Sequence, residues 1–517
     1  MTFLSEQISS YYESFSNIFL DVYFLSSGSF FPITLVVLAM FSMFISRFGF
    51  EGFGLRKVIR KDQVFNFFMT AYIALAFAYL IYPNYHDHIE SSVSIMSKSL
   101  LSGNPLYTYS DVWPYSMLVY GPYLFIFEAF LFTTGLPVIE ASKLLGFLSI
   151  MGSFILVRIL FKKNLSLNML ILILPAGFSL FWNRPEPLII FFTLLSLFFS
   201  RSLVSIYSKL FFGLSLGVLV NLKISMLPIA FLIFLLGMLF NKLNAKSIIQ
   251  VISAGIFSLV IPFFSNQIDI TDYADFIFSV STEGVDYWIL ATNFIFFMLI
   301  ILYTKPFLKN INLSKELILI VYVLFFLAFI PSIKPGAGIW HLLPIVLISA
   351  FIIEKSKEKE EPFEGRHIFN SVCLLASVFL IYFSFILISK QGYWNQVKYE
   401  LASIEQKYPG IKMGVTNLER YGETFYRVML SGDQLDAPAF MDLNFIGQNE
   451  NEFTKKLSNC TIDLLVLPNS GEPFSLENFY TQNPLFSNET KAIFNERFAL
   501  IKSFNYYNVY QCAPKNL

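Results

Sequence analysis

The sequence predicts an α-helical polytopic membrane protein that ends in a small soluble α/β domain. Of its 517 residues, 55% are hydrophobic and only 14% are charged, and the mean hydropathy is +0.61. A soluble core cannot hide that much apolar surface, so the surplus must face lipid. Apolar runs recur up to Ser389, after which the composition becomes ordinary. We therefore expect a transmembrane domain at 1–389 and a soluble domain at 390–517.

About twelve apolar runs are candidates for membrane spans, because a helix crosses the hydrocarbon core with about 20 apolar residues. No Lys or Arg precedes Arg47, so the first run lacks the basic region of a cleaved signal peptide and is expected to be retained. The shorter runs are also compatible with broken helices that line a cavity. The runs lie near 30–48, 65–83, 139–160, 165–182, 187–200, 208–221, 226–240, 247–265, 288–303, 317–331, 342–354 and 367–389.

Lys and Arg are unevenly divided between the connections of these runs. Basic residues accumulate on the cytoplasmic side of membrane proteins, and here they crowd alternate connections, as at 47–61 and 355–366. This asymmetry predicts that both termini and the 390–517 domain lie outside the cytoplasm, and the short loops favour a bacterial inner membrane. The opposite connections hold only Lys98, Arg184, Lys223 and Lys334.

A further apolar run, 116–134, is predicted not to cross the membrane. If it crossed, the charge pattern of all later connections would invert. Its Tyr and Glu side chains suit the membrane surface better than the lipid interior, so we expect an interfacial helix. A large external loop then extends over 84–140.

The 390–517 segment has charges, Gly and Pro punctuation and a strand-like run at 462–467, which are typical of a small α/β domain. Cys460 and Cys512 both fall in it, where an oxidising compartment would permit a disulfide. The chain has zero formal net charge and no Gly-rich nucleotide loop, Walker sequence or His-Glu-x-x-His helix. We expect neither a nucleic-acid partner nor an ATP-driven activity.

The external loop opens with four ionisable residues in five positions: His86, Asp87, His88 and Glu90. Asp87 and Glu90 are three positions apart and would share a helix face, a spacing that can hold one hydroxyl or one divalent cation between two carboxylates. His86 and His88 add candidate metal ligands or a proton relay. A solvated helix start is the structural alternative.

Ionisable residues also occur in short external connections later in the chain. Polar groups at membrane depth are costly and tend to face a cavity, so Arg184 is a candidate phosphate ligand and Glu186 a candidate for orienting a sugar or an acceptor. Lys223 and Lys334 are external exceptions to the charge rule, and His341 begins a helix whose N-terminus would attract an anion. A local ion pair and lysines that reach lipid head groups are the structural alternatives.

The order of these segments resembles the GT-C superfamily, integral membrane glycosyltransferases that take a sugar from a polyprenyl-phosphate donor. The likeness covers about 65–390. The loop-one acids look like the family's carboxylate motif, and the segments that follow are similar to the family's later external motifs. Those segments are Gly103-Asn-Pro-Leu-Tyr107, Tyr120-Gly-Pro-Tyr123, Asn183-Arg-Pro-Glu-Pro187 and a Gly-x-x-His-Leu-Leu-Pro stretch at 338–344.

The resemblance implies an inverting sugar transfer on the extracytoplasmic face, to a lipid, glycan or protein acceptor. Asp87 is the implied general base, and Glu90 would orient the acceptor or help to bind a cation. Because the family often has adjacent acids or Asp-x-Asp, whereas this chain has Asp87-His-Ile-Glu90, Mg²⁺ or Mn²⁺ stays an open alternative. The implied donor-phosphate ligands are Arg184, Lys223, Lys334 and His341, and the implied substrate contacts are His86, His88, Tyr120 and Glu186.

Two other classes remain open: a transporter or flippase of lipid-linked glycans, and a polymerase or ligase of surface polysaccharide. Transporters tend to show internal repeats with sites near the bilayer midplane, whereas here no repeat is evident and the unusual charges gather at one face. Polysaccharide polymerases typically have a very large late loop, whereas the large loop of this chain comes early. The glycosyltransferase interpretation is therefore favoured.

Overall fold

The computed structural model describes most of the chain beyond residue 60. The first predicted span, near 30–48, and most of the predicted run at 165–182 lie outside the described residues, as do His86 and Asp87. The described ranges are 61–85, 88–107, 119–162, 179–281, 284–311, 314–334, 337–356, 366–408, 412–413, 451–469, 472–475 and 486–513, with a few single residues between them.

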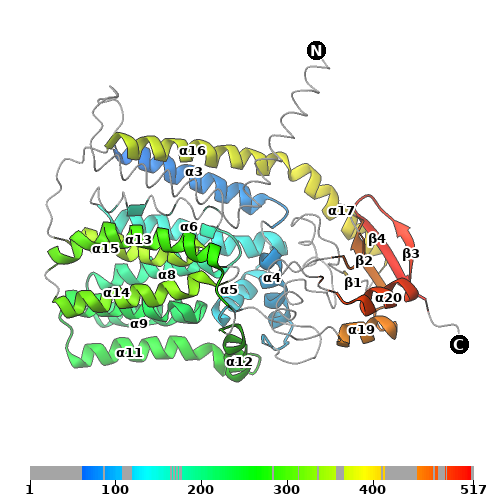
Figure 1. Ribbon diagram of the computed structural model, residues 1–517, viewed down its shortest axis with the longest axis horizontal. Coiled ribbons are helices and arrows are strands. Elements are labelled where there is room, and N and C mark those ends of the chain that lie inside the picture. The colour runs from blue at the N-terminus through cyan, green and yellow to red at the C-terminus, as the bar shows by residue number, and fades with distance from the viewer. Residues whose placement is uncertain are drawn as a thin grey trace, which may run out of the picture.

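Long apolar helices lie side by side and form the larger part of the molecule (Figure 1). Each predicted run that falls within the described residues coincides with one of them, and six helical segments there are long and apolar enough to cross a membrane. The helices are α3 (Lys61–Ile81), α6 (Val138–Leu160), α8 (Pro185–Ser200), α9 (Ile206–Leu222), α10 (Leu227–Asn241), α11 (Ala245–Val260), α13 (Tyr287–Asn310), α14 (Lys315–Phe329), α15 (Leu343–Lys355) and α16 (Arg366–Ser389).

Small residues allow α9 and α11 to approach closely. An ideal Cβ on Gly213 would lie 2.3 Å from the carbonyl oxygen of Val251, and one on Gly217 would lie 2.3 Å from that of Gly255. The four-residue spacing of Gly213 and Gly217 places both on one face of α9. Glycines at such an interface let two backbones touch, which is how helices gain packing energy where lipid offers no hydrophobic drive.

Short helices gather at one end of this bundle, on the side of the C-terminal sheet (Figure 1). They are α4 (His88–Leu101), α5 (Pro122–Phe132) and α12 (Ile270–Ser281). Helix α5 lies within the predicted interfacial run, and its 11 residues are too few to cross a core that needs about 20. Helix α12 was not predicted, because it is short and its polar residues make this segment of the sequence resemble a loop.

The start of α5 docks directly on the end of α9. The Gly121 N–H donates to the carbonyl of Leu222 at 3.0 Å, and the Tyr123 N–H donates to Oδ1 of Asn221 at 3.2 Å. An ideal Cβ on Gly121 would lie 1.3 Å from the carbonyl oxygen of Asn221, so only glycine permits this approach. The Tyr-Gly-Pro-Tyr motif is thus explained by a backbone contact.

The described residues of the C-terminal domain form a four-stranded sheet with helices beside it. Strand order is β1–β2–β4–β3, with β1 parallel to β2 and the other pairs antiparallel. Its elements are α17 (Gln391–Lys407), β1 (Lys412–Met413), α19 (Asn451–Ser458), β2 (Leu464–Pro468), α20 (Asn488–Arg497), β3 (Phe498–Ser503) and β4 (Tyr507–Cys512).

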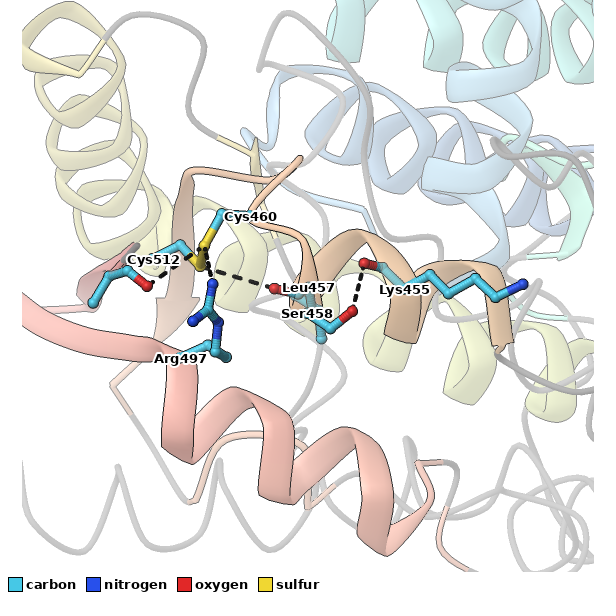
Figure 2. Close-up of a disulfide and its surroundings, with 7 residues drawn as sticks. Lys455, Leu457, Ser458, Cys460, Arg497 and Cys512 are labelled. Atoms are coloured by element: carbon cyan, nitrogen blue, oxygen red, sulfur yellow. Dashed lines mark hydrogen bonds between the residues drawn. A yellow bond between two sulfur atoms is a disulfide. The ribbon is translucent and has the colours of Figure 1, made fainter. Parts of the chain in front are cut away.

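A disulfide closes this domain. Cys460, after α19, is bonded to Cys512 at the end of β4, which settles a pairing that the sequence only permitted. Figure 2 shows Arg497 of α20 reaching the same point, with Nη2 3.2 Å from Sγ of Cys460. Closing a loop of this length stabilises a fold by about 4 kcal/mol in the chain-entropy model.

Helix α17 joins the domain to the bundle. It begins at Gln391, directly after α16 ends at Ser389, and Nε2 of Gln391 donates to the carbonyl of Ile81 at 2.8 Å. Lys398 lies 3.8 Å from Glu140 of α6. Farther along α17, the Glu400 carboxylate accepts hydrogen bonds from the backbone N–H groups of residues 505–507, at the turn between β3 and β4. One helix therefore contacts both parts of the molecule.

Replacing Gly121 by Ala should destabilise the protein, because the methyl group would overlap the carbonyl of Asn221. Overpacking of this kind costs about 1–3 kcal/mol, so the thermal unfolding midpoint in detergent should fall. Gly392→Ala on α17 is the matched control, since no atom lies within 4 Å of the position that its Cβ would take. An unchanged midpoint for Gly121→Ala would show that the observed backbone contact is not formed.

Candidate functional site

Two groups of buried polar residues meet at the turn that precedes α8. The first, the carboxylate network, consists of Glu90, Ser94, Ser97, Glu128 and Asn183. The second, the basic cluster, consists of Arg184, Glu186, Lys223 and His341. Asn183 and Arg184 are consecutive, so one peptide bond separates the two groups.

Glu90 lies in the first turn of α4 with no exposed surface. The hydroxyl of Tyr79 donates to both of its carboxylate oxygens at 2.7 Å, and the backbone N–H of Asn183 donates to Oε2 at 2.6 Å. A buried carboxylate is tolerated when hydrogen-bond donors surround it. Glu90 therefore ties the end of α3 and the turn before α8 to the start of loop one.

Glu128 of α5 is equally buried and faces α4. Its Oε1 accepts from Ser94 at 2.6 Å and from Nδ2 of Asn183 at 2.8 Å, and its Oε2 lies 2.5 Å from Oγ of Ser97. Ser97 has a single hydroxyl hydrogen and also lies 2.9 Å from the carbonyl of Val93. Burial raises the pKa of Glu128 to about 7, while the hydrogen bonds from Ser94, Ser97 and Asn183 act in the opposite direction.

Asn183 holds the two acids together. Besides its backbone bond to Glu90, its Nδ2 lies 3.2 Å from the Glu90 carbonyl, 2.9 Å from Oγ of Ser94 and 2.8 Å from Oε1 of Glu128. The side-chain amide supplies donors to a region that is otherwise rich in acceptors. It thereby connects α4, α5 and the turn before α8.

Lys143 of α6 caps the end of α3. Its ammonium group is buried and donates to the backbone carbonyls of Tyr79, Tyr82 and Asn84. It also lies 4.2 Å from the ring centroid of Tyr79, a cation–π contact. Carbonyls at a helix end lack part of their helical hydrogen bonding, and here the lysine donates to one carbonyl in the last turn of α3 and to two in the residues that follow Ile81. The start of loop one is thus tied to α6.

The basic cluster is built on the turn before α8 and on the ends of two other helices. Arg184 stacks 4.1 Å above the ring of Trp182, whose Nε1 donates to Glu186 at 3.1 Å. Lys223, between α9 and the 3-10 helix η2 (Ile224–Met226), lies 3.6 Å from Glu186 and 3.2 Å from Nε2 of His341. Four residues from three connections therefore converge at one place.

Burial and neighbouring charges shift the pKa values of two residues in this cluster. Burial lowers the pKa of Lys223, and the nearby Arg184 lowers it further, while Glu186 acts in the opposite direction. Burial, followed by Lys223 and Arg184, lowers the pKa of His341 well below its usual range. His341 is therefore neutral at physiological pH. Among the described residues, the cluster brings two basic side chains, Arg184 and Lys223, together with the carboxylate of Glu186, and basic groups of this kind can bind an anion.

The remaining predicted residues lie at several places around these groups. The ring of Tyr120 lies 5.5 Å from Nζ of Lys223, at the edge of the basic cluster. Lys334 is half-buried at the end of the 3-10 helix η4 (Ile330–Ile333), whose neighbour η5 (Ile339–Leu342) contains His341. His88 is the first residue of α4, while His86 and Asp87 lie outside the described residues.

Gly338, the first residue of the Gly-x-x-His-Leu-Leu-Pro stretch, makes room for an aromatic side chain. Gly336 lies outside the described residues, and the space for a Cβ on Gly338 is filled by the ring of Trp340, 2.3 Å away. The Trp340 ring packs edge-on to Trp182 with centroids 5.5 Å apart. Gly338 thus lets an aromatic wall form beside Arg184.

A cation site remains a hypothesis. Within the described residues, no group of three or more His, Cys, Asp and Glu side chains is close enough to hold a metal ion. Glu90, one of the two acids predicted to share a cation, directs its oxygens toward Tyr79 and Asn183. Its partner Asp87 lies outside the described residues.

Glu128, Lys143 and Asn183 are among the residues of the site that the sequence reasoning missed. Glu128 and Lys143 are single charges inside apolar runs, and such charges are costly enough to indicate a buried partner. Their local sequence by itself indicates only an interfacial helix and the start of a span. Asn183 gives no such signal, because a neutral amide in a turn is ordinary.

Comparison with known proteins supports the fold. No protein-family model and no curated protein sequence matches the chain. Among solved structures, ArnT from Cupriavidus metallidurans in the apo state is similar, with a TM-score of 0.52, 12% identity and coverage of 88% of this chain and 99% of that one. The structure of ArnT bound to undecaprenyl phosphate is similar too, with a TM-score of 0.50, 11% identity and coverage of 88% and 100%.

At this level of identity the shared property is the fold. The likeness extends over most of both chains, so it includes the helical bundle and is not a match of a few helices. The chain therefore has a polytopic helical membrane fold like that of ArnT, as the sequence predicted.

Proposed function

We propose that the protein is a glycosyltransferase that moves a sugar from a polyprenyl-phosphate-linked donor to an acceptor hydroxyl on the extracytoplasmic face of the membrane. The observation that carries this proposal is the basic cluster of Arg184, Lys223 and His341 at one end of an ArnT-like bundle. One ArnT structure contains undecaprenyl phosphate, which supports a polyprenyl lipid as the carrier. The acceptor class, whether lipid, glycan or protein, stays open.

The leaving group of such a reaction is an anionic lipid phosphate. Its departure needs nearby positive charge more than a strong acid, and preorganised cations in a water-poor site are effective for this. Arg184 and Lys223 would supply that charge, Lys334 would add to it from the neighbouring turn, and neutral His341 would donate or accept a single hydrogen bond. Glu186 holds Lys223 and Trp182 in place.

In the proposed chemistry, the acceptor oxygen attacks the anomeric carbon as its proton passes to the carboxylate of Asp87. The bond from that carbon to the phosphate oxygen breaks, and the lipid phosphate leaves with the electron pair. A single displacement inverts the anomeric centre. The buried contacts of Glu90 suit a role in holding α4 in position, with Asp87 as the group that meets the acceptor.

The side of the membrane is supported by the C-terminal domain. Its disulfide, Cys460–Cys512, is the kind of bond that persists in oxidising compartments. The domain lies at the end of the bundle where α4, α5 and α12 gather (Figure 1). An extracytoplasmic position of this end agrees with the low number of Lys and Arg residues in the connections there.

Asp87→Asn should abolish sugar transfer while leaving the folded, membrane-inserted protein intact, because the amide cannot accept the acceptor's proton. The loss should be at least about 100-fold, as is usual for general bases, measured with purified protein and a polyprenyl-phosphate sugar. Asp269→Asn, at a fully exposed helix start, is the control. Near-normal turnover of the Asp87 variant would remove it from the role of base.

Lys223→Met should weaken binding of polyprenyl phosphate about 30–100-fold, since a desolvated charge-assisted contact contributes about 2–3 kcal/mol. Lys334→Ala should act in the same direction. Lys355→Met is the control, because Lys355 lies at the opposite end of α15 from His341, beside Phe240 and Phe351. Unchanged affinity in the Lys223 variant would exclude the basic cluster as the phosphate site.

A further inference from the structure

We infer that Asn183 is a positioning residue that holds the basic cluster at a defined distance from the loop-one helix α4. The effect of Asn183 on catalysis rests on the proposed function, whereas its positioning role depends only on the described contacts. Asn183 is neutral, and its side-chain amide donates into the carboxylate network and not to the basic cluster.

Asn183 joins several elements at once. Its backbone and side chain contact Glu90 and Ser94 of α4 and Glu128 of α5, all four residues being buried. Each of these contacts is short, between 2.6 and 2.9 Å. If one member of such a buried network moves, the remaining carboxylates and hydroxyls lose hydrogen bonds that water cannot replace. The folded state then loses stability.

Asn183 is also the direct neighbour of Arg184 in the chain. Its two neighbours, Trp182 and Arg184, contact each other across it, and the Arg184 N–H donates to the carbonyl of Trp182 at 3.0 Å. Trp182 in turn bonds Glu186, which bonds Lys223. The turn before α8 is thus internally braced on one side and fastened to α4 and α5 on the other. Asn183 is where the two sets of contacts join.

The distance that Asn183 sets is one that the proposed reaction depends on. The acceptor side of that reaction lies at the start of α4, and the donor phosphate lies at the basic cluster. The two reacting groups must meet within hydrogen-bonding and bond-forming distance, and a misplacement of about 1 Å can cost about 100-fold in rate. A residue that fixes this distance affects turnover without touching either substrate.

The test measures the distance between two spin labels and requires no substrate. Spin labels at Leu101→Cys on α4 and Ile224→Cys in η2, both at exposed positions, report the separation of the two sides by pulsed electron paramagnetic resonance. Cys373 is buried and is replaced by Ala, while Cys460 and Cys512 remain bonded. The parent protein should give a narrow distribution, and Asn183→Ala should give a broader one.

Two further variants probe the same hydrogen bond from α5. Glu128→Leu removes the acceptor of the Asn183 amide and should broaden the distribution as Asn183→Ala does. Glu128→Gln keeps an oxygen that accepts from the Asn183 amide, and its own amide can donate to Oγ of Ser97, so the distance distribution should stay narrow. If Glu128→Leu stays narrow, or Glu128→Gln broadens the distribution as much as Glu128→Leu does, the proposed contact is overturned.

Asn241→Ala is the matched control. Asn241 is a partly buried amide near the opposite end of the bundle, bonded to the carbonyls of Ser200 and Gly237 and to the N–H of Leu203. Its loss should lower thermal stability without changing the labelled distance. Equal broadening in Asn183→Ala and Asn241→Ala would show a general loss of packing and would contradict the inference.

A kinetic arm separates positioning from binding. Asn183→Ala should lower kcat about 100-fold while the Kd for polyprenyl phosphate changes less than about threefold, because the basic cluster keeps its own contacts. A fall in donor affinity as large as the fall in kcat would overturn the positioning role. If the parent protein transfers no sugar at all, the proposed function fails, and the distance measurement still decides the role of Asn183.

Discussion

Satisfying two buried carboxylates with a limited number of donors is the constraint on which the site depends. Glu90 and Glu128 lie without solvent contact at the junction of α4, α5 and α8, so every donor that faces them must be in place. Glu90 accepts from a tyrosine hydroxyl and a backbone N–H. Glu128 accepts from the hydroxyls of Ser94 and Ser97 and from the side-chain amide of Asn183. These hydrogen bonds fix how loop one sits on the bundle.

The basic cluster has the opposite character. Arg184 and Lys223 are held by a stacking contact with Trp182 and an ion pair with Glu186, and basic side chains outnumber acidic ones among the described residues of this cluster. Its position one residue away from the carboxylate network brings a candidate phosphate site and a candidate acceptor site to the same turn.

Several features followed from the sequence by itself. Apolar runs separated by charged connections determine a helical membrane protein, since every polar backbone group in lipid must be bonded within a helix. The uneven placement of Lys and Arg singled out Arg184, Lys223 and Lys334, and the order of short motifs indicated the fold that ArnT shares. These signals are local or periodic patterns, so they can be recognised in a single amino-acid sequence.

Only the tertiary structure decided which of these residues meet. Lys223 and His341 are far apart in the chain and lie 3.2 Å apart in the fold, and Gly121 is required by a carbonyl of α9 that its own neighbours do not reveal. The roles of Asn183, Glu128 and Lys143 are likewise set by partners on other helices. Hydrogen bonds of buried groups depend on packing between distant segments, and local sequence patterns contain no record of that packing.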